Sequence, residues 1–166
     1  MSMVTESQPE MEPEWRARFP NAAVFEQHTF IPRPLDEVFD FFSRAENLET
    51  LTPPTVQFEI LTPLPIEMRV GAGIDYRIKI HGIPVKWKTE IIVWEPGVQF
   101  VDVQLKGPYR LWHHRHMFTE VPGGVDMVDT VHYRSPLHAL LVPLFIRKDI
   151  EKIFAHRTTA LAALFG

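Results

Sequence analysis

Histidines carry the most reactive chemistry in this 166-residue sequence. Three of the eight, His113, His114 and His116, fall in a segment that alternates like a β-strand. On a strand His114 and His116 share one face, because successive side chains point to opposite sides of the sheet. The hairpin that follows could place Asp129 opposite His116, provided that the loop length keeps that register. A His–Asp pair lining an apolar pocket could then act in general acid–base catalysis.

The same histidines have two other interpretations. Two histidines two residues apart could begin a metal site, but the sequence shows no third ligand, so neither a metal nor a cofactor is predicted. The other interpretation, which the pattern favours, is that these are sheet histidines with hydrogen-bonded or solvated rings.

Arg157 is the second reactive group, because it falls near the centre of an apolar helical stripe. Its guanidinium could hold a ligand carboxylate, phenolate or phosphate at a cavity wall. The structural alternative, which we favour, is a stem lying along the sheet with its head paired to an acid or reaching water. A partner is expected either way, since an unpaired buried charge is costly.

The helix that positions Arg157 is predicted over residues 143–165. Pro143 suits a first turn, where a missing N–H does no harm. The apolar residues recur with the helical period of 3.6, which indicates a helix laid on a core. They are Val142, Ile146, Ile150, Ile153, Phe154, Ala160, Leu161 and Leu164. A long helix of this kind needs an apolar surface to cover.

Alternating strands supply that surface. Period-2 patterns predict strands at residues 23–31, 56–61, 74–80, 83–91, 100–105, 111–118 and 125–134. A two-residue turn at His81-Gly82 would set Ile78 opposite Val85 and Tyr76 opposite Trp87. Two short helices, at 34–42 and 45–51, would plug one end. One strand, two short helices, further strands and one long helix predict an α+β fold with a curved antiparallel sheet of six or seven strands.

Composition excludes several classes of protein. A net charge of −4 without a basic stripe argues against nucleic-acid binding, and the absence of cysteine excludes disulfides and thiolate metal sites. No apolar run is long enough to span a membrane, and the acidic start lacks a signal-peptide core, so we expect a cytoplasmic protein. Residues 1–21 are predicted to be a flexible arm, with Trp15 and Phe19 able to dock, and residues 22–166 a single domain.

Three motifs and the C-terminal helix identify a family resemblance. They are IPRPLDEVF at 31–39, NLETLTP at 47–53 and GPYRLWHHRHMF at 107–118. In this order they resemble the helix-grip proteins of the START or Bet v 1-like (SRPBCC) superfamily, especially its small bacterial polyketide cyclase/dehydrase or ligand-binding members. The resemblance covers about residues 22–166. It implies a deep apolar cavity between sheet and helix that takes lipids, sterols, polyketides or other aromatic compounds.

The leading hypothesis is binding or carriage of a small hydrophobic molecule. The first alternative is a cyclase or dehydratase acting on a polyketide-like substrate, with His116, Arg157 and Asp129 as candidate catalytic residues. The second is a protein-interaction module, and either a monomer or a homodimer is compatible with the sequence. Aromatic residues with a polar tip suit a pocket for a flat ligand, although core packing explains them as well. The predicted ligand-binding residues are Tyr76, Ile78, Trp87, Val101, Val103, Trp112, His114, His116, Tyr133, Ile150, Phe154 and Arg157.

Overall fold

One antiparallel sheet and one long helix make up most of the fold in this computed structural model, which describes residues 11–137 and 145–166. The strands follow the spatial order β1-β7-β6-β5-β4-β3-β2. They are β1 (Ala23–Ile31), β2 (Glu59–Ile60), β3 (Gly73–Ile80), β4 (Ile83–Glu95), β5 (Gln99–Lys106), β6 (Leu111–Val121) and β7 (Gly124–Arg134). The helices are α1 (Pro13–Arg18), α2 (Leu35–Phe42), α3 (Asn47–Thr50) and α5 (Arg147–Phe165), with a 3₁₀ turn, η1, at Pro54–Val56.

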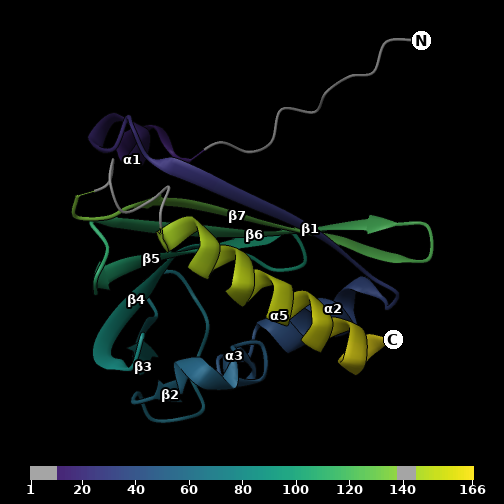
Figure 1. Ribbon diagram of the computed structural model, residues 1–166. Helices are drawn as coiled ribbons and strands as arrows, with labels where there is room; N and C mark the ends of the chain where they lie inside the picture. The colour runs from purple at the N-terminus through teal and green to yellow at the C-terminus, as the bar shows by residue number, and fades with distance from the viewer. Residues whose placement is uncertain (1–10, 138–144) are drawn as a thin grey trace.

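The curved sheet wraps around α5, which confirms the predicted α+β helix-grip fold (Figure 1). Register shifts between β4 and β5 lie beside Thr89 and Val93. Such bulges bend a strand and increase its twist, which helps the sheet to curve. α5 crosses the concave face, and α2 lies near its C-terminal half (Figure 1).

The β3–β4 hairpin has the predicted register. His81 and Gly82 both adopt positive φ, 49° and 80°. Two such residues form the tight turn whose twist matches the flanking strands, and glycine adopts this conformation without a steric penalty. Tyr76 consequently pairs with Trp87, and Ile78 with Val85.

One predicted strand differs from the structure, and one predicted helix start falls on residues that the structure does not describe. The strand expected over residues 56–61 is reduced to β2, because Pro54 begins a 3₁₀ turn and Gln57 then takes a left-handed conformation with φ of 47°. The long helix α5 is described over Arg147–Phe165, directly after a π-helical turn at residues 145 and 146. The predicted first turn at Pro143 lies outside the described residues.

α2 closes one end of the space beneath α5, as predicted for the first short helix. It buries Val38, Phe39 and Phe42. The rings of Phe39 and Phe42 contact the ring of Phe118 on β6, with centroids 5.2 and 5.4 Å apart. Edge-to-face and tilted aromatic pairs of this kind are favourable beyond the area that they bury. The Phe41 ring of α2 also lies 5.2 Å from the Phe165 ring, so α2 joins the C-terminal end of α5 to the sheet.

The segment that contains α1 lies against β6 on the outer face of the sheet. The flexible arm expected over residues 1–21 stays a prediction, and its first ten residues lie outside the described ones. Glu12 accepts hydrogen bonds from His113 Nε2 and Arg115 Nη2, both at 2.6 Å. Met11 is buried, and the Trp15 ring lies 6.2 Å from the His113 ring, which confirms the predicted docking of Trp15. Acidic composition suggested solvation, but Glu12 instead neutralises a buried cation.

Glu12→Gln should lower the free energy of unfolding by about 2 kcal/mol, since it weakens charge-assisted hydrogen bonds to Arg115 and His113. Partial burial opposes ionisation of Glu12, but the hydrogen bond from His113 and the charge of Arg115 lower its pKa from 4.5 to about 2. The stabilisation is therefore complete above pH 4.5 and is lost as the pH falls toward 2.

Urea unfolding at pH 7 and pH 3 checks this prediction. The difference between wild type and Glu12→Gln should shrink at pH 3. Glu14→Gln, at an exposed position of α1, is the matched control and should have little effect at either pH. A difference that grows on acidification would contradict the assigned role of the carboxylate.

Candidate ligand cavity and its polar cluster

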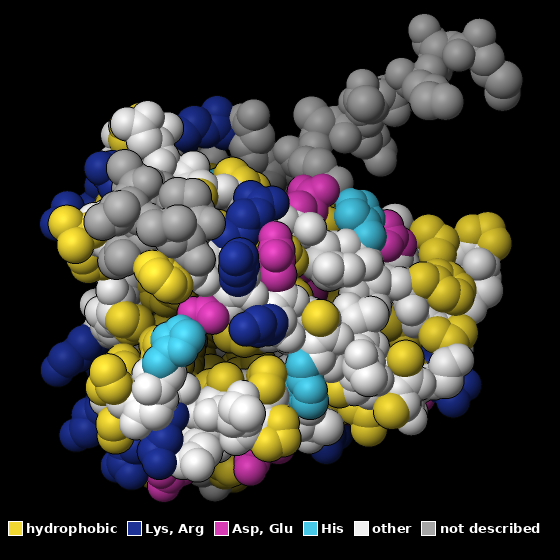
Figure 2. Space-filling model, viewed as in Figure 1, with side chains coloured by type: hydrophobic (Ala, Val, Ile, Leu, Met, Phe, Trp, Pro, Cys, Tyr) yellow, Lys and Arg dark blue, Asp and Glu magenta, His cyan; other side chains and the backbone are white. Residues whose placement is uncertain are grey.

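A cavity of about 590 Å³ lies between the sheet and α5. This volume is within the range of small-molecule sites, roughly 300–1,000 Å³. Figure 2 shows its mouth as a hollow with hydrophobic side chains inside. Its apolar and aromatic lining includes Phe42, Ile74, Tyr76, Ile78, Trp87, Phe100, Tyr109, Trp112, Ile150 and Phe154.

Nine of the twelve predicted ligand-binding residues line this cavity: Tyr76, Ile78, Trp87, Trp112, His114, His116, Ile150, Phe154 and Arg157. Their contact with a ligand stays a prediction.

Three predicted residues do not line the cavity. Val101 and Val103 pair with Arg115 and His113, so they lie on the outer face of the sheet. We expected apolar side chains on β5 to face the cavity. Val101 and Val103 are buried on the outer face instead, so hydrophobicity does not distinguish the two faces of this strand. Tyr133 is fully buried in a core cluster with Phe25 and Phe154.

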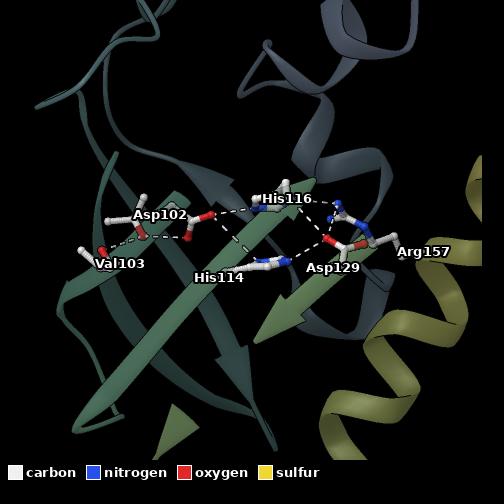
Figure 3. A network of polar contacts seen from close by, with 7 residues as sticks. Asp102, Val103, His114, His116, Asp129 and Arg157 are labelled. Carbon is white, nitrogen blue, oxygen red and sulfur yellow. Dashed lines mark hydrogen bonds and ion pairs between the residues drawn. The ribbon is translucent and has the colours of Figure 1, made fainter. Parts of the chain in front are cut away.

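Five charged or titratable residues form a polar cluster at the inner wall (Figure 3). Asp102 comes from β5, His114 and His116 from β6, Asp129 from β7 and Arg157 from α5. The Nε2 atom of His116 lies 2.8 Å from Asp102 Oδ2, and its Nδ1 atom lies 3.2 Å from Asp129 Oδ1. The Nε2 atom of His114 and Nη2 of Arg157 lie 2.8 and 3.2 Å from that same Asp129 oxygen. The two imidazole rings are 3.7 Å apart.

Strand register explains how these groups meet. His116 pairs with Asp129, as predicted, and Asp102 pairs with His114. Residues paired across antiparallel strands lie on the same face with short separations between their Cβ atoms. Asp102 was missed as a site residue, although it interrupts an apolar strand, because its placement beside His114 depends on the β5–β6 loop.

The cluster shifts the pKa values of the two histidines in opposite directions. Burial and the neighbouring charge of His116 lower the pKa of His114 to about 4, which leaves His114 neutral at pH 7. Burial would also lower the pKa of His116, but hydrogen bonds and charge from Asp102 and Asp129 outweigh burial and raise its pKa. Burial likewise opposes ionisation of Asp129, yet Arg157 and the two histidines hold its pKa well below the ordinary value.

Arg157 serves the structural role that we favoured for it and also reaches the cavity wall. Its side chain is buried, and its guanidinium donates to Asp129. The guanidinium carbon lies 5.1 Å from the ring centroid of Phe42 and 5.8 Å from that of Phe154, which adds cation–π attraction. The ion pair therefore links α5 to β7 across the sheet–helix interface.

One side of the mouth is bridged by a polar contact. His81, in the β3–β4 turn, lies with its Nε2 atom 2.8 Å from Oδ2 of Asp149 in the first turn of α5. Both residues line the cavity and both are partly exposed. This contact joins the tip of the hairpin to the helix beside the cavity.

A curved antiparallel sheet gripping a long C-terminal helix, with a cavity between them, defines the START or Bet v 1-like (SRPBCC) class. Residues 31–161 match the model of the family described as polyketide cyclase / dehydrase and lipid transport. The chain belongs to that family. No curated protein matches it.

Solved structures of low sequence identity share the fold. Protein CV1439 from Chromobacterium violaceum is 15% identical, with a TM-score of 0.69 and coverage of 88% of this chain and 97% of that one. Ginseng major latex-like protein 151 from Panax ginseng is 13% identical, with a TM-score of 0.64 and coverage of 87% and 97%. The Zhui aromatase/cyclase from Streptomyces sp. R1128 is 14% identical, with a TM-score of 0.65 and coverage of 85% and 92%. Within the described ranges, no helix has the length and hydropathy of a membrane span.

Arg157→Met should destabilise the fold by roughly 3–5 kcal/mol, because it leaves the Asp129 charge buried without its main counter-charge. The double variant Arg157→Met/Asp129→Asn should recover much of that loss, since it removes both charges. Chemical denaturation of the wild type, the two single variants and the double variant gives the coupling energy directly. Additive losses would show that the two side chains do not depend on one another.

His81→Ala should speed the release of a bound apolar fluorophore by about fivefold, because one hydrogen bond contributes about 1 kcal/mol to keeping the hairpin tip attached to α5 beside the cavity. Stopped-flow dissociation measures this rate. Glu151→Gln, which breaks an exposed ion pair with Arg147 on α5, is the matched control. Equal dissociation rates in wild type and His81→Ala would rule out a gating role for the contact.

Proposed function

We propose that the protein binds a small, flat hydrophobic molecule that carries a polar oxygen at one end. The observation that supports this most directly is the aromatic cavity of about 590 Å³ with Asp102, His114 and His116 at its inner wall. Such a site combines apolar contact over most of the ligand with a few polar groups that fix its orientation. The proposed location is the cytoplasm.

Aromatic side chains favour a flat ligand. The rings of Tyr76 and Trp87 stack with an interplanar angle of 16° and centroids 5.9 Å apart. Trp112 meets Trp87 edge-on at 5.5 Å. The indole N–H of Trp87 is buried and has no acceptor among the described residues, so it can donate to a ligand oxygen.

His114 supplies an acceptor for the polar end. Its Nε2–H donates to Asp129, and the low pKa leaves its Nδ1 atom unprotonated at neutral pH. That Nδ1 atom lies 4.0 Å from Asp102, which is beyond hydrogen-bonding distance. A ligand hydroxyl in the cavity can therefore donate to His114, while Arg157 compensates the charge behind it.

The alternative function is a cyclase or dehydratase acting on a polyketide-like substrate, and the pair of histidines favours it specifically. A neutral His114 held by Asp129 has the form of a general base, and His116 beside it, whose pKa is raised by Asp102 and Asp129, is the candidate general acid. Titratable neighbours whose pKa values are driven apart mark acid–base assignments in many enzymes. The third possibility, an interaction module, has less support, because the interior holds a cavity.

Ile78→Trp should weaken ligand binding at least tenfold, because the added indole occupies the cavity that Ile78 lines. Lys86→Trp places the same side chain at an exposed position on the same hairpin and should bind normally. Denaturing mass spectrometry of the native protein identifies any co-purified ligand, and fluorescence titration with an apolar dye gives the affinities. Equal binding by both variants would count against the cavity as the site.

The His114→Gln variant distinguishes catalysis from carriage. Its turnover and binding are measured with the ligand that mass spectrometry identifies. Loss of turnover with binding kept within a few-fold supports the enzyme. If the wild type binds the compound and leaves it chemically unchanged, carriage is the function.

A further inference from the structure

We propose that Asp102, His114 and His116 form a binding site for a divalent first-row transition metal ion such as Zn²⁺, at the inner wall of the cavity. One ligand atom from each residue lies within 4.8 Å of the other two. Asp102 Oδ2, His114 Nδ1 and His116 Nε2 are the atoms that face one another across the two ion pairs of Asp102 with the histidines. Two imidazoles and one carboxylate are a common protein ligand set for such ions. The sequence offered two histidines and no third ligand; the β5–β6 pairing supplies Asp102 as the third.

The separations of the ligand atoms suit an ion after small side-chain rotations. Asp102 Oδ2 lies 2.8 Å from His116 Nε2 and 4.0 Å from His114 Nδ1. An ion with bonds near 2.1 Å holds adjacent ligand atoms roughly 3–3.5 Å apart. To hold the ion, Asp102 Oδ2 and His116 Nε2 have to move slightly apart, and Asp102 Oδ2 and His114 Nδ1 slightly closer together. Side-chain rotation achieves both while the backbone pairing of the strands stays in place.

The opposite edges of both rings have the support that metal-bound histidines usually have. Asp129 Oδ1 lies 2.8 Å from His114 Nε2 and 3.2 Å from His116 Nδ1, the nitrogens that face away from the proposed ion. Figure 3 shows the rings between Asp102 on one side and Asp129 on the other. Metal-ligating histidines commonly donate their second N–H to a carboxylate, which fixes the tautomer and the ring orientation. Thr89 Oγ1 lies 3.5 Å from Asp102 Oδ1, the carboxylate oxygen that the ion does not use.

The charges around the cluster favour a cation there and then an anionic ligand. Asp102 and Asp129 carry two negative charges against the one positive charge of Arg157. The ion takes the place of the proton between His116 Nε2 and Asp102 Oδ2, so both imidazoles are neutral once it is bound and the cluster then carries a single excess positive charge. A carboxylate, phenolate or enolate oxygen would then complete the coordination shell.

The remaining coordination positions open toward the cavity. Asp102, His114 and His116 all contribute to its lining, together with the aromatic side chains of Phe100 and Trp112. The ring of Phe100 stacks on His116 at 4.1 Å, which shields one side of the cluster. Three protein ligands with an open position are typical of ions that contact a substrate or ligand. The class of organic ligand rests on the proposed function; the metal site itself does not.

Metal binding is measured with the metal alone. Metal-free full-length protein is titrated calorimetrically with Zn²⁺, and with Co²⁺ while visible absorption is recorded. The expected result is one equivalent bound, with affinity lowered at least tenfold in Asp102→Asn and in His114→Gln. His28→Gln is the matched control, because His28 lies on the surface within 3.3 Å of two carboxylates, Glu26 and Asp126, and its loss should change nothing.

A second measurement does not depend on the folding of the variants. Long-range ¹H–¹⁵N spectra of wild-type protein should show Zn²⁺ bound through Nδ1 of His114 and Nε2 of His116. The proposal is overturned if no stoichiometric ion binds, or if binding survives Asp102→Asn and His114→Gln but is lost in His28→Gln. Dye binding by the metal-free protein is measured separately, so a failure of the organic ligand site is told apart from a failure of the metal site.

Discussion

The buried carboxylate of Asp129 is the constraint on which the site depends. One of its oxygens faces Arg157 and both cavity histidines, and its side chain is 1% exposed. A charge so deeply buried is tolerated only when it is paired and hydrogen-bonded. Satisfying it requires β6, β7 and α5 to meet in one arrangement. The position of the helix above the sheet, and with it the shape of the cavity wall, follows from that requirement.

β6 is organised around burial on both faces. His114 and His116 face the cavity, and His113 and Arg115 face outward to Glu12. A slip of one residue would exchange the two sets, because side chains alternate along a strand. Glu12 pairs with one set and Asp129 with the other, so a slip would break both groups of contacts at once.

The cavity exists because α5 is held away from part of the sheet. At one end, α2 contributes an aromatic cluster with Phe118, and at the other the His81–Asp149 contact joins the hairpin to the helix. Between these supports the sheet curves away, and side chains from β3 to β6 line the space. The family and the solved structures establish this architecture. The chemistry of the particular site has to be argued from its residues, because one fold hosts many functions.

Periodicity determined the elements of this protein. Alternation and helical spacing predicted β1, the β3–β4 hairpin and α2, as well as the pairing of His116 with Asp129 across a short turn, because these depend on neighbours in the sequence. Tertiary structure decided which faces are covered. Val101 and Val103 face outward beside Arg115 and His113, Tyr133 belongs to the core, and Asp102 joins the histidines. Those outcomes depend on the β5–β6 register and on the contact between Glu12 and Arg115 on the outer face. The local pattern of a strand encodes neither of these long-range contacts.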